Sequence, residues 1–229
     1  MTFPFPQFAP LAKAPVVTTY HTAVTDGSGS SPWSEPGLSI GSAYTTRRVF
    51  VAIAAPSTGT ALNPAVSGVT IGGVTGILYG ARRHSSNTFH EVSFWYADVS
   101  TGTTATVVIT GASGHNRSSM TVAGVWSLDN SLLLNNQPTD SAFDSTASGS
   151  PLSASVTVQA GGFVLAVVCR QSSSGTYTWG AITERYDVDA GNQIVSSASD
   201  NFTTGGTVAV TSTPSGTSVT QILYAVAGR

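Results

Sequence analysis

The stretch "YADVSTGTTATVVITG" (residues 96–111) decides the fold. Two sets of side chains alternate in its second half, the apolar Ala105, Val107 and Ile109 and the polar Thr104, Thr106 and Thr110. A period of two with many β-branched residues is typical of a strand with one buried face. The Ser-Thr-Gly sequence in front of it favours a turn. We therefore predict a turn followed by a half-buried strand.

Much the same phrase returns as "SDNFTTGGTVAVTSTPSG" (residues 199–216). Four phrases recur in the same order: "VFVAIA" at Val49 and "FVLAVV" at Phe163, "VSGVTIGGVTGILY" at Val66 and "YTWGAITERY" at Tyr177, "STGTTATVVITG" at Ser100 and "TTGGTVAVTSTPSG" at Thr203, "SSMTVAGVWSL" at Ser118 and "TSVTQILYAVAG" at Thr217. A unit of about four strands cannot bury both of its faces alone. We predict a pseudo-repeat whose two copies form the halves of one sandwich. The alternative is that strand–turn series resemble one another without a repeat.

The remaining strand signals agree with an all-β fold, because helical periodicity is nearly absent. "RVFVAIAA" from Arg48 and "GGFVLAVV" from Gly161 are continuous apolar runs, typical of central strands buried on both faces. In "EVSFWYA" (residues 91–97), Phe94 and Trp95 belong to opposite faces, so we expect one of them to face away from the core. The frequency of strands and turns predicts an antiparallel, jelly-roll-like β-sandwich.

The N-terminal segment differs from the rest of the chain. Its large apolar residues alternate with four prolines, and they are Phe3, Phe5, Phe8 and Leu11. Proline fixes φ and removes amide donors, so residues 1–15 are predicted to form an extended arm. The arm either packs along its own sandwich or docks on a partner. Residues 16–229 are predicted to form one domain, with halves at about 16–130 and 152–229 and a connector at 131–151.

Composition limits the functional classes. The chain has 229 residues, 9% of them charged, and a formal net charge of −2, which excludes a strongly basic nucleic-acid surface. The arginine doublets at 47–48 and 82–83 are predicted at strand ends. Cys169 is the only cysteine, so no intramolecular disulfide is possible, and its apolar neighbours predict a small buried side chain.

The sequence shows no signal peptide for export and no membrane-spanning segment. "MTFPFPQFAPLAKAP" lacks the basic and continuous apolar regions of a signal peptide. No stretch approaches the ~20 apolar residues that span a bilayer. We expect a protein made in the cytoplasm and not anchored in a membrane.

No motif for catalysis or cofactor binding occurs in the sequence, and we predict no catalytic, cofactor-binding or metal residues. His84 and His90, with Glu91 beside them, would need further ligands for a metal site. Asp187 and Asp189 in "DVDAGN" resemble a calcium loop only weakly, which leaves calcium binding open. Outside the connector, Glu184 and Asp187 are the close carboxylate pair that sits near a likely strand, as a hydrolase would need, although Arg185 between them indicates surface pairing instead. The chain is therefore predicted not to be an enzyme.

Two tryptophans are candidates for carbohydrate contact. Trp33 lies in the proline-flanked "SSPWSEPG", which favours an exposed loop, and Trp95 is opposite Phe94 on its strand. Exposed aromatic rings can stack on sugars, while ordinary core packing is the alternative.

Several phrases carry a family resemblance: "GSAYTTRRVFVAIAA", "SGVTIGGV", "FWYADVSTGTTATVVITG" and "TWGAITERYD…SSASDNF". From about Thr19 onward the chain resembles uncharacterised β-sandwich proteins among the structural genes of tailed phages and prophages, especially of alphaproteobacterial hosts. The resemblance implies a virion protein made in the host cytoplasm, either a head decoration or a tail appendage. It implies contacts with other virion proteins and a homo-oligomer, and it carries no catalytic residues. A module that binds host surface glycans is the alternative function.

Overall fold

The structure, a computed structural model, describes residues 15–26, 31–57, 66–84, 89–111, 120–129, 135–146, 148–171, 174–189, 193–216 and 220–229. These residues form strands joined by turns and loops, and no helix occurs among them. The strands are β1 (Thr18–Asp26), β2 (Trp33–Ser39), β3 (Arg48–Ser57), β4 (Val66–Ile71), β5 (Val74–Thr75), β6 (Ile77–Arg83), β7 (Phe89–Asp98), β8 (Thr104–Gly111), β9 (Met120–Leu128), β10 (Asp140–Thr146), β11 (Leu152–Val158), β12 (Gly162–Gln171), β13 (Tyr177–Gly180), β14 (Thr183–Asp189), β15 (Gln193–Phe202), β16 (Gly206–Pro214) and β17 (Gln221–Gly228).

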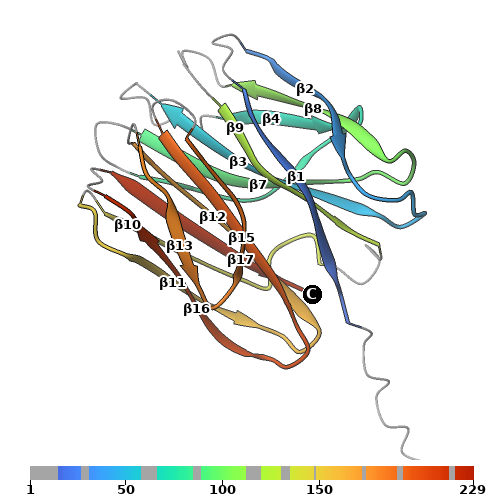
Figure 1. Ribbon diagram of the computed structural model, residues 1–229. Coiled ribbons are helices and arrows are strands. Elements are labelled where there is room, and N and C mark those ends of the chain that lie inside the picture. The colour runs from blue at the N-terminus through green and yellow to red at the C-terminus, as the bar shows by residue number, and fades with distance from the viewer. Residues whose placement is uncertain are drawn as a thin grey trace, which may run out of the picture.

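The strands form four antiparallel sheets, two in each half of the chain (Figure 1). In the first half, a five-stranded sheet of order β1-β9-β3-β7-β6 faces a four-stranded sheet of order β2-β8-β4-β5. In the second half, a five-stranded sheet of order β10-β17-β12-β15-β14 faces a three-stranded sheet of order β11-β16-β13. The chain crosses repeatedly between the two sheets of its half, in the manner of a jelly roll. The predicted all-β, jelly-roll-like sandwich is confirmed.

The two halves repeat one topology. Substituting β10, β11, β12, β13, β14, β15, β16 and β17 for β1, β2, β3, β4, β6, β7, β8 and β9 converts the first pair of sheet orders into the second, and only β5 has no counterpart. The four recurring phrases fall on strands matched in this way. The register predicted for the first phrase pair, which aligns Val49 with Phe163, is wrong by one residue. Phe163 lies in the same core as Phe50, whereas Val49 lies in another core. A one-residue shift exchanges the two faces of a strand.

The halves are not arranged as the two sheets of one sandwich, which is how the repeat was expected to fold. Each half forms a sandwich of its own, because β3 and β12 are apolar on both faces and need cover on both sides. The segment expected to be a connector at 131–151 contains β10, which pairs with β17 and completes the second five-stranded sheet. The result is four layers, with the two five-stranded sheets in the middle (Figure 1).

Three apolar cores separate the four layers. The middle core lies between the five-stranded sheets and is rich in aromatic rings, among them Phe50, Phe94, Trp126, Phe163 and Tyr224. Phe50 and Phe163 come from matched strands and meet with ring centroids 5.7 Å apart in an edge-to-face arrangement. Such pairs add to the stability that burial alone provides. The middle core therefore joins the two repeats through the same face of each.

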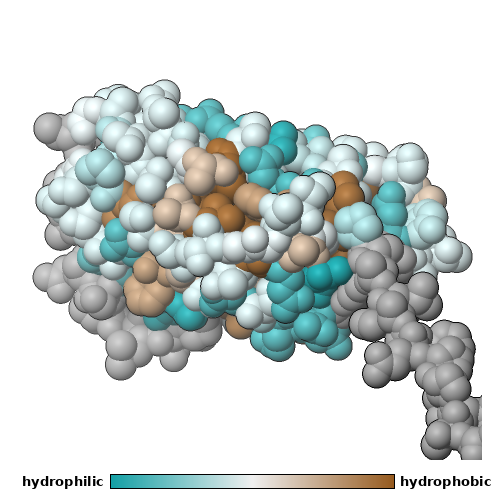
Figure 2. All heavy atoms as spheres, turned by 90° about the horizontal axis from the view of Figure 1, so that it is seen from below, coloured by the Kyte–Doolittle hydropathy of each residue, from teal (hydrophilic) through white to brown (hydrophobic). Residues whose placement is uncertain are grey.

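The outer sheets present hydroxyl groups rather than charges to solvent. On β11, Ser153, Ser155 and Thr157 are exposed, and the residues that alternate with them are buried. Figure 2 shows the underside of the molecule in Figure 1, on the side of β11 and β16: most residues there are pale, near the middle of the hydropathy scale, and apolar residues gather near the centre. The predicted alternation on β8 is confirmed, since Ala105, Val107 and Ile109 are buried.

Candidate functional site

Both tryptophans proposed for carbohydrate contact lie in the core of the first sandwich. Trp33 is 1% exposed and begins β2, with its ring over Gly111, where a Cβ would come within 2.7 Å of it. Trp95 is 8% exposed in the same core, and its Nε1 donates to Ser93 Oγ at 3.1 Å. Phe94 on the opposite face is also buried, in the middle core. Neither tryptophan presents a ring face to a sugar, and the expectation that Phe94 or Trp95 faces away from the core is wrong.

The arm residues Phe3, Phe5, Phe8 and Leu11 lie outside the described residues. The described chain begins at Pro15, which packs against Gly161 in the turn between β11 and β12. The next residue, Val16, donates its N–H to Gly161 O at 2.7 Å. The root of the arm is thus fixed to the second half of the molecule, although β1 belongs to the first.

The histidine pair is buried rather than displayed at a turn. His90 is 3% exposed at the start of β7, and neither ring nitrogen has a hydrogen-bond partner among the described residues. Burial, with a smaller contribution from the nearby His84, lowers the pKa of His90 to about 4. Glu91 points to the other face of β7, where it accepts from Arg83 Nη2 at 2.7 Å and from Val66 N at 3.2 Å. These contacts give His90 and Glu91 separate environments.

The buried His90 predicts acid sensitivity. Between pH 6.5 and 4 the unfolded chain protonates this imidazole and the folded chain does not, so stability falls as the pH is lowered through that window. The loss is on the order of 3 kcal/mol, at about 1.4 kcal/mol for each unit of pKa difference. Urea unfolding at pH 7 and pH 4 should show a smaller loss for His90→Phe than for the wild type. Equal losses in the two proteins would contradict this role of His90.

The carboxylates of β14 have structural partners. A β-bulge at Arg185 places Glu184 and Asp187 on the same face, opposite Ala198 and Ser196 of β15. Burial raises the pKa of both carboxyls, and Asp187 raises that of Glu184 further. Asp187 Oδ2 accepts from Tyr177 N at 2.8 Å, which connects β14 to β13. Asp187 thereby holds two edge strands together.

The described residues contain neither a cluster of metal ligands nor a membrane-spanning helix. Within the ranges given above, no three His, Cys, Asp or Glu side chains are grouped so that they could hold a metal ion, at Asp187 and Asp189 or elsewhere. The same part of the chain contains no helix that is long and apolar enough to cross a membrane.

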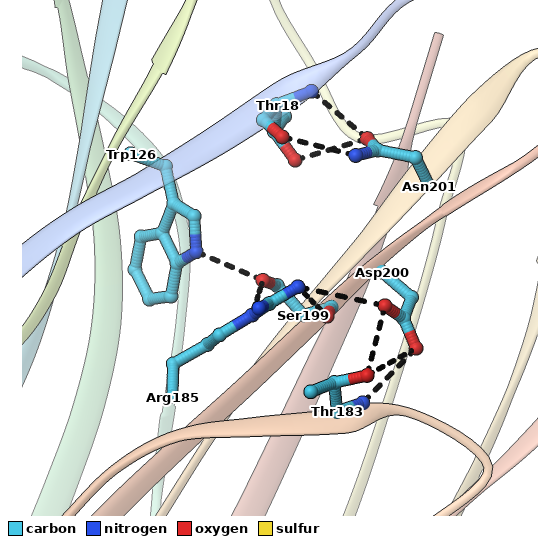
Figure 3. A network of polar contacts seen from close by, with 7 residues as sticks. All are labelled: Thr18, Trp126, Thr183, Arg185, Ser199, Asp200 and Asn201. Atoms are coloured by element: carbon cyan, nitrogen blue, oxygen red, sulfur yellow. Dashed lines mark hydrogen bonds and ion pairs between the residues drawn. The ribbon is translucent and has the colours of Figure 1, made fainter. Parts of the chain in front are cut away.

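A polar network joins the two halves beside the aromatic core (Figure 3). Ser199 Oγ of β15 accepts from Trp126 Nε1 of β9 and from Arg185 Nε of β14, each at 3.0 Å. Asn201 of β15 accepts from Thr18 N at 2.8 Å and donates to Thr18 O at 2.9 Å, in the pattern of a strand pair. The bond from Trp126 and the two bonds between Thr18 and Asn201 orient the sheets relative to each other, because their donors and acceptors lie in different halves. The bond from Arg185 joins β14 to β15 within the second half.

The opposite side of the same interface is closed by packing. Arg82 of β6 lies over the rings of Tyr224 and Phe143, 5.1 and 5.3 Å from their centroids. Gly80 makes room for Tyr224, because a Cβ on Gly80 would lie 2.1 Å from Tyr224 Oη. The interface between the repeats is therefore continuous from β1 to β6, with Tyr224 buried and Phe143 half exposed at its margin.

The first sandwich has an exposed apolar corner, which consists of Val74, Ile77 and Leu78 at β5 and the start of β6. Their exposed fractions are 40%, 50% and 43%. The corresponding strand of the other repeat is β14, and both β6 and β14 have a β-bulge at their third residue. Thr183 and Glu184 of β14 therefore occupy the positions that correspond to Ile77 and Leu78 of β6. The apolar corner is thus a difference between two otherwise matched edges.

Sequence comparison adds no relative. No protein-family model, no curated protein and no solved structure matches this chain. The apolar corner was not predicted from the sequence. Its signal is the alignment of "GILYGARR" with "ITERYD" in the repeat, in which apolar residues of the first copy replace polar residues of the second at a matched strand edge.

Proposed function

We propose that this protein is a non-enzymatic virion structural protein of a tailed phage, a head decoration or tail appendage that attaches through protein–protein contacts. The apolar corner is the observation that carries the proposal. Val74, Ile77 and Leu78 are exposed along one strand edge, Ile77 on the face of Tyr96 and Leu78 on that of Trp95, and an apolar edge without charges favours contact with a further chain. The four-layer slab would present such a contact rigidly.

The family resemblance and the N-terminal arm support the same proposal. Jelly-roll sandwiches occur in viral capsid proteins and in lectins, so the fold fits both candidate functions and does not decide between them. The glycan-binding alternative depended on Trp33 and Trp95, which are buried. The contact proposal depends on residues that are exposed.

Localisation on purified particles tests the proposal. Gold-labelled antibody should mark discrete positions on phage particles carrying the full chain. A variant lacking residues 1–14 keeps Pro15 and its contact with Gly161, so we expect it to fold with an unchanged melting temperature and to be missing from particles. Full-length protein that stays entirely in the soluble fraction would contradict the virion proposal. Normal labelling by the truncated variant would contradict the role of the arm.

A further inference from the structure

We propose that residues 1–14 of one copy bind the apolar corner of a second copy, and that two copies exchange their arms in this way to form a dimer. The inference rests on the proposed function, because it takes the arm as the docking element and names its partner. The occupant of the corner is then the chain's own N-terminal segment, supplied in trans.

The corner differs from the edges at β14 and β11 in what protects it. Unpaired strand edges recruit further chain unless charges or a covering segment block them. The matched edge strand β14 carries Glu184, Arg185, Asp187 and Asp189. At β11 the edge N–H groups of Ser153 and Thr157 are taken by Asp144 and Asp140 of β10. Strand β6 has no charged residue in its first five positions, and no strand of the described ranges pairs with its outer edge.

The chemistry of the arm fits the corner. Residues 1–14 contain three phenylalanines and one leucine, and Lys13 is their only charged residue. Each phenylalanine can bury 150–250 Å², so two exchanged arms would bury on the order of 1,000 Å² through these rings alone. This approaches the area of a specific interface. Proline fixes φ, so a segment with three prolines loses less conformational entropy when it docks than one without them.

The root of the arm and the corner lie at the same end of the molecule. Thr18 is opposite Leu128, Leu128 is opposite Arg48, and Arg48 is opposite Asp98 across the sheet. Ile77 is opposite Tyr96, which lies two residues before Asp98 on β7. Val17, beside the root, is 55% exposed. Two copies that meet at this end would bring each arm to the partner's corner.

The exit of the arm favours exchange over a return to its own corner. Strands β1 and β6 are the two edges of one sheet, four strand spacings or about 19 Å apart. Before β1 the chain bonds to Gly161 of the second half, whereas β6 is the opposite edge of the first five-stranded sheet. Returning would require a reversal in a segment stiffened by Pro4, Pro6 and Pro10. A partner's corner needs no reversal, and fourteen extended residues reach about 43 Å.

Sedimentation of the full chain at micromolar concentration gives the first test. We expect a dimer, and at least tenfold weaker dimerisation when residues 1–14 are deleted or when Ile77→Thr and Leu78→Glu are combined. These replacements copy the matched edge of β14, so the variant should keep its fold and melting temperature. The control Thr183→Ser with Glu184→Gln changes the matched corner and should stay dimeric. A monomeric wild type, or a dimer that survives the substitutions in β6, would overturn the proposal.

Disulfide trapping distinguishes exchange from self-docking. Cys169 is fully buried and burial raises the pKa of its thiol, so engineered cysteines react without competition. Chains carrying only Phe8→Cys are mixed with chains carrying only Leu78→Cys and oxidised. Exchange predicts a linked pair of chains that contains residues 8 and 78. A link that forms only within a chain carrying both cysteines, or no link at all, would overturn it. Absence of the protein from phage particles would contradict the proposed function but would not affect the evidence for arm exchange.

Discussion

Replacing Trp126 with alanine is expected to lower the free energy of unfolding by about 3–5 kcal/mol, the usual cost of removing a buried tryptophan. Trp126 is fully buried in the middle core, and Tyr20 and Phe94 pack on it with ring centroids 5.7 and 6.4 Å away. Its indole N–H also reaches across the interface to Ser199 Oγ. The variant therefore loses packing and a bond between the halves. Urea unfolding followed by far-UV circular dichroism measures the change.

Two variants separate these contributions. Trp126→Phe keeps a ring in the core and removes the N–H, so it should cost less than Trp126→Ala. Ser199→Ala leaves the indole N–H and the Arg185 Nε without this acceptor, and we expect a loss of about 1–3 kcal/mol. The sum of the losses should exceed that of the double variant, because the two groups bond to each other. A loss below about 1 kcal/mol for Trp126→Ala would contradict its position between the sheets.

Replacing Arg47 with methionine is expected to cost on the order of 3–5 kcal/mol, because it leaves several loop carbonyls without their donor and each unsatisfied buried polar group costs about 1–3 kcal/mol. Arg47 is fully buried, and its guanidinium donates to five carbonyls: Gly41, Ser42, Val99, Thr101 and Gly102. The distances range from 2.6 to 2.9 Å. One side chain thus satisfies the loop before β3 and the loop after β7. Methionine fills similar volume without a donor.

The adjacent arginine provides a matched control for this prediction. Arg48 forms an ion pair with Asp98 at 2.7 Å, but the Asp98 side chain is 54% exposed. The Arg48 side chain is 5% exposed, but an asparagine at position 98 keeps an oxygen that can accept from it, so Asp98→Asn should cost less than Arg47→Met. The loss of stability for Arg47→Lys should lie between those for Asp98→Asn and Arg47→Met, because a lysine has three donors but lacks the planar guanidinium. Thermal unfolding of the four proteins in one buffer compares them. A small loss for Arg47→Met would show that the carbonyls find other donors.

Local patterns predicted the strands well, because alternation depends only on neighbouring residues. The faces of β7 and β8, the central positions of β3 and β12 and the burial of Cys169 and Trp126 all follow from such patterns. The number of layers could not be predicted, because it depends on which sheets meet. The pattern predicts one of Phe94 and Trp95 on a face away from the core, whereas a sheet covers each face of β7.

The candidate site was less accessible to sequence reasoning. Trp33 was placed in an exposed loop by its neighbouring prolines, whereas β2 carries it into a core beside Gly111. The roles of Arg47 and Ser199 depend on residues more than fifty positions away, which no local pattern contains. The apolar corner becomes visible only when β6 is compared with β14, and that comparison requires the strand pairing of both repeats.

The central claim is that two repeated sandwiches bury each other through their five-stranded sheets. Scanning calorimetry of the full chain tests this directly, because a shared core makes the halves unfold together. We predict one transition whose calorimetric enthalpy equals the van 't Hoff enthalpy. Two separate transitions, or a calorimetric enthalpy about twice the van 't Hoff value, would contradict the shared core.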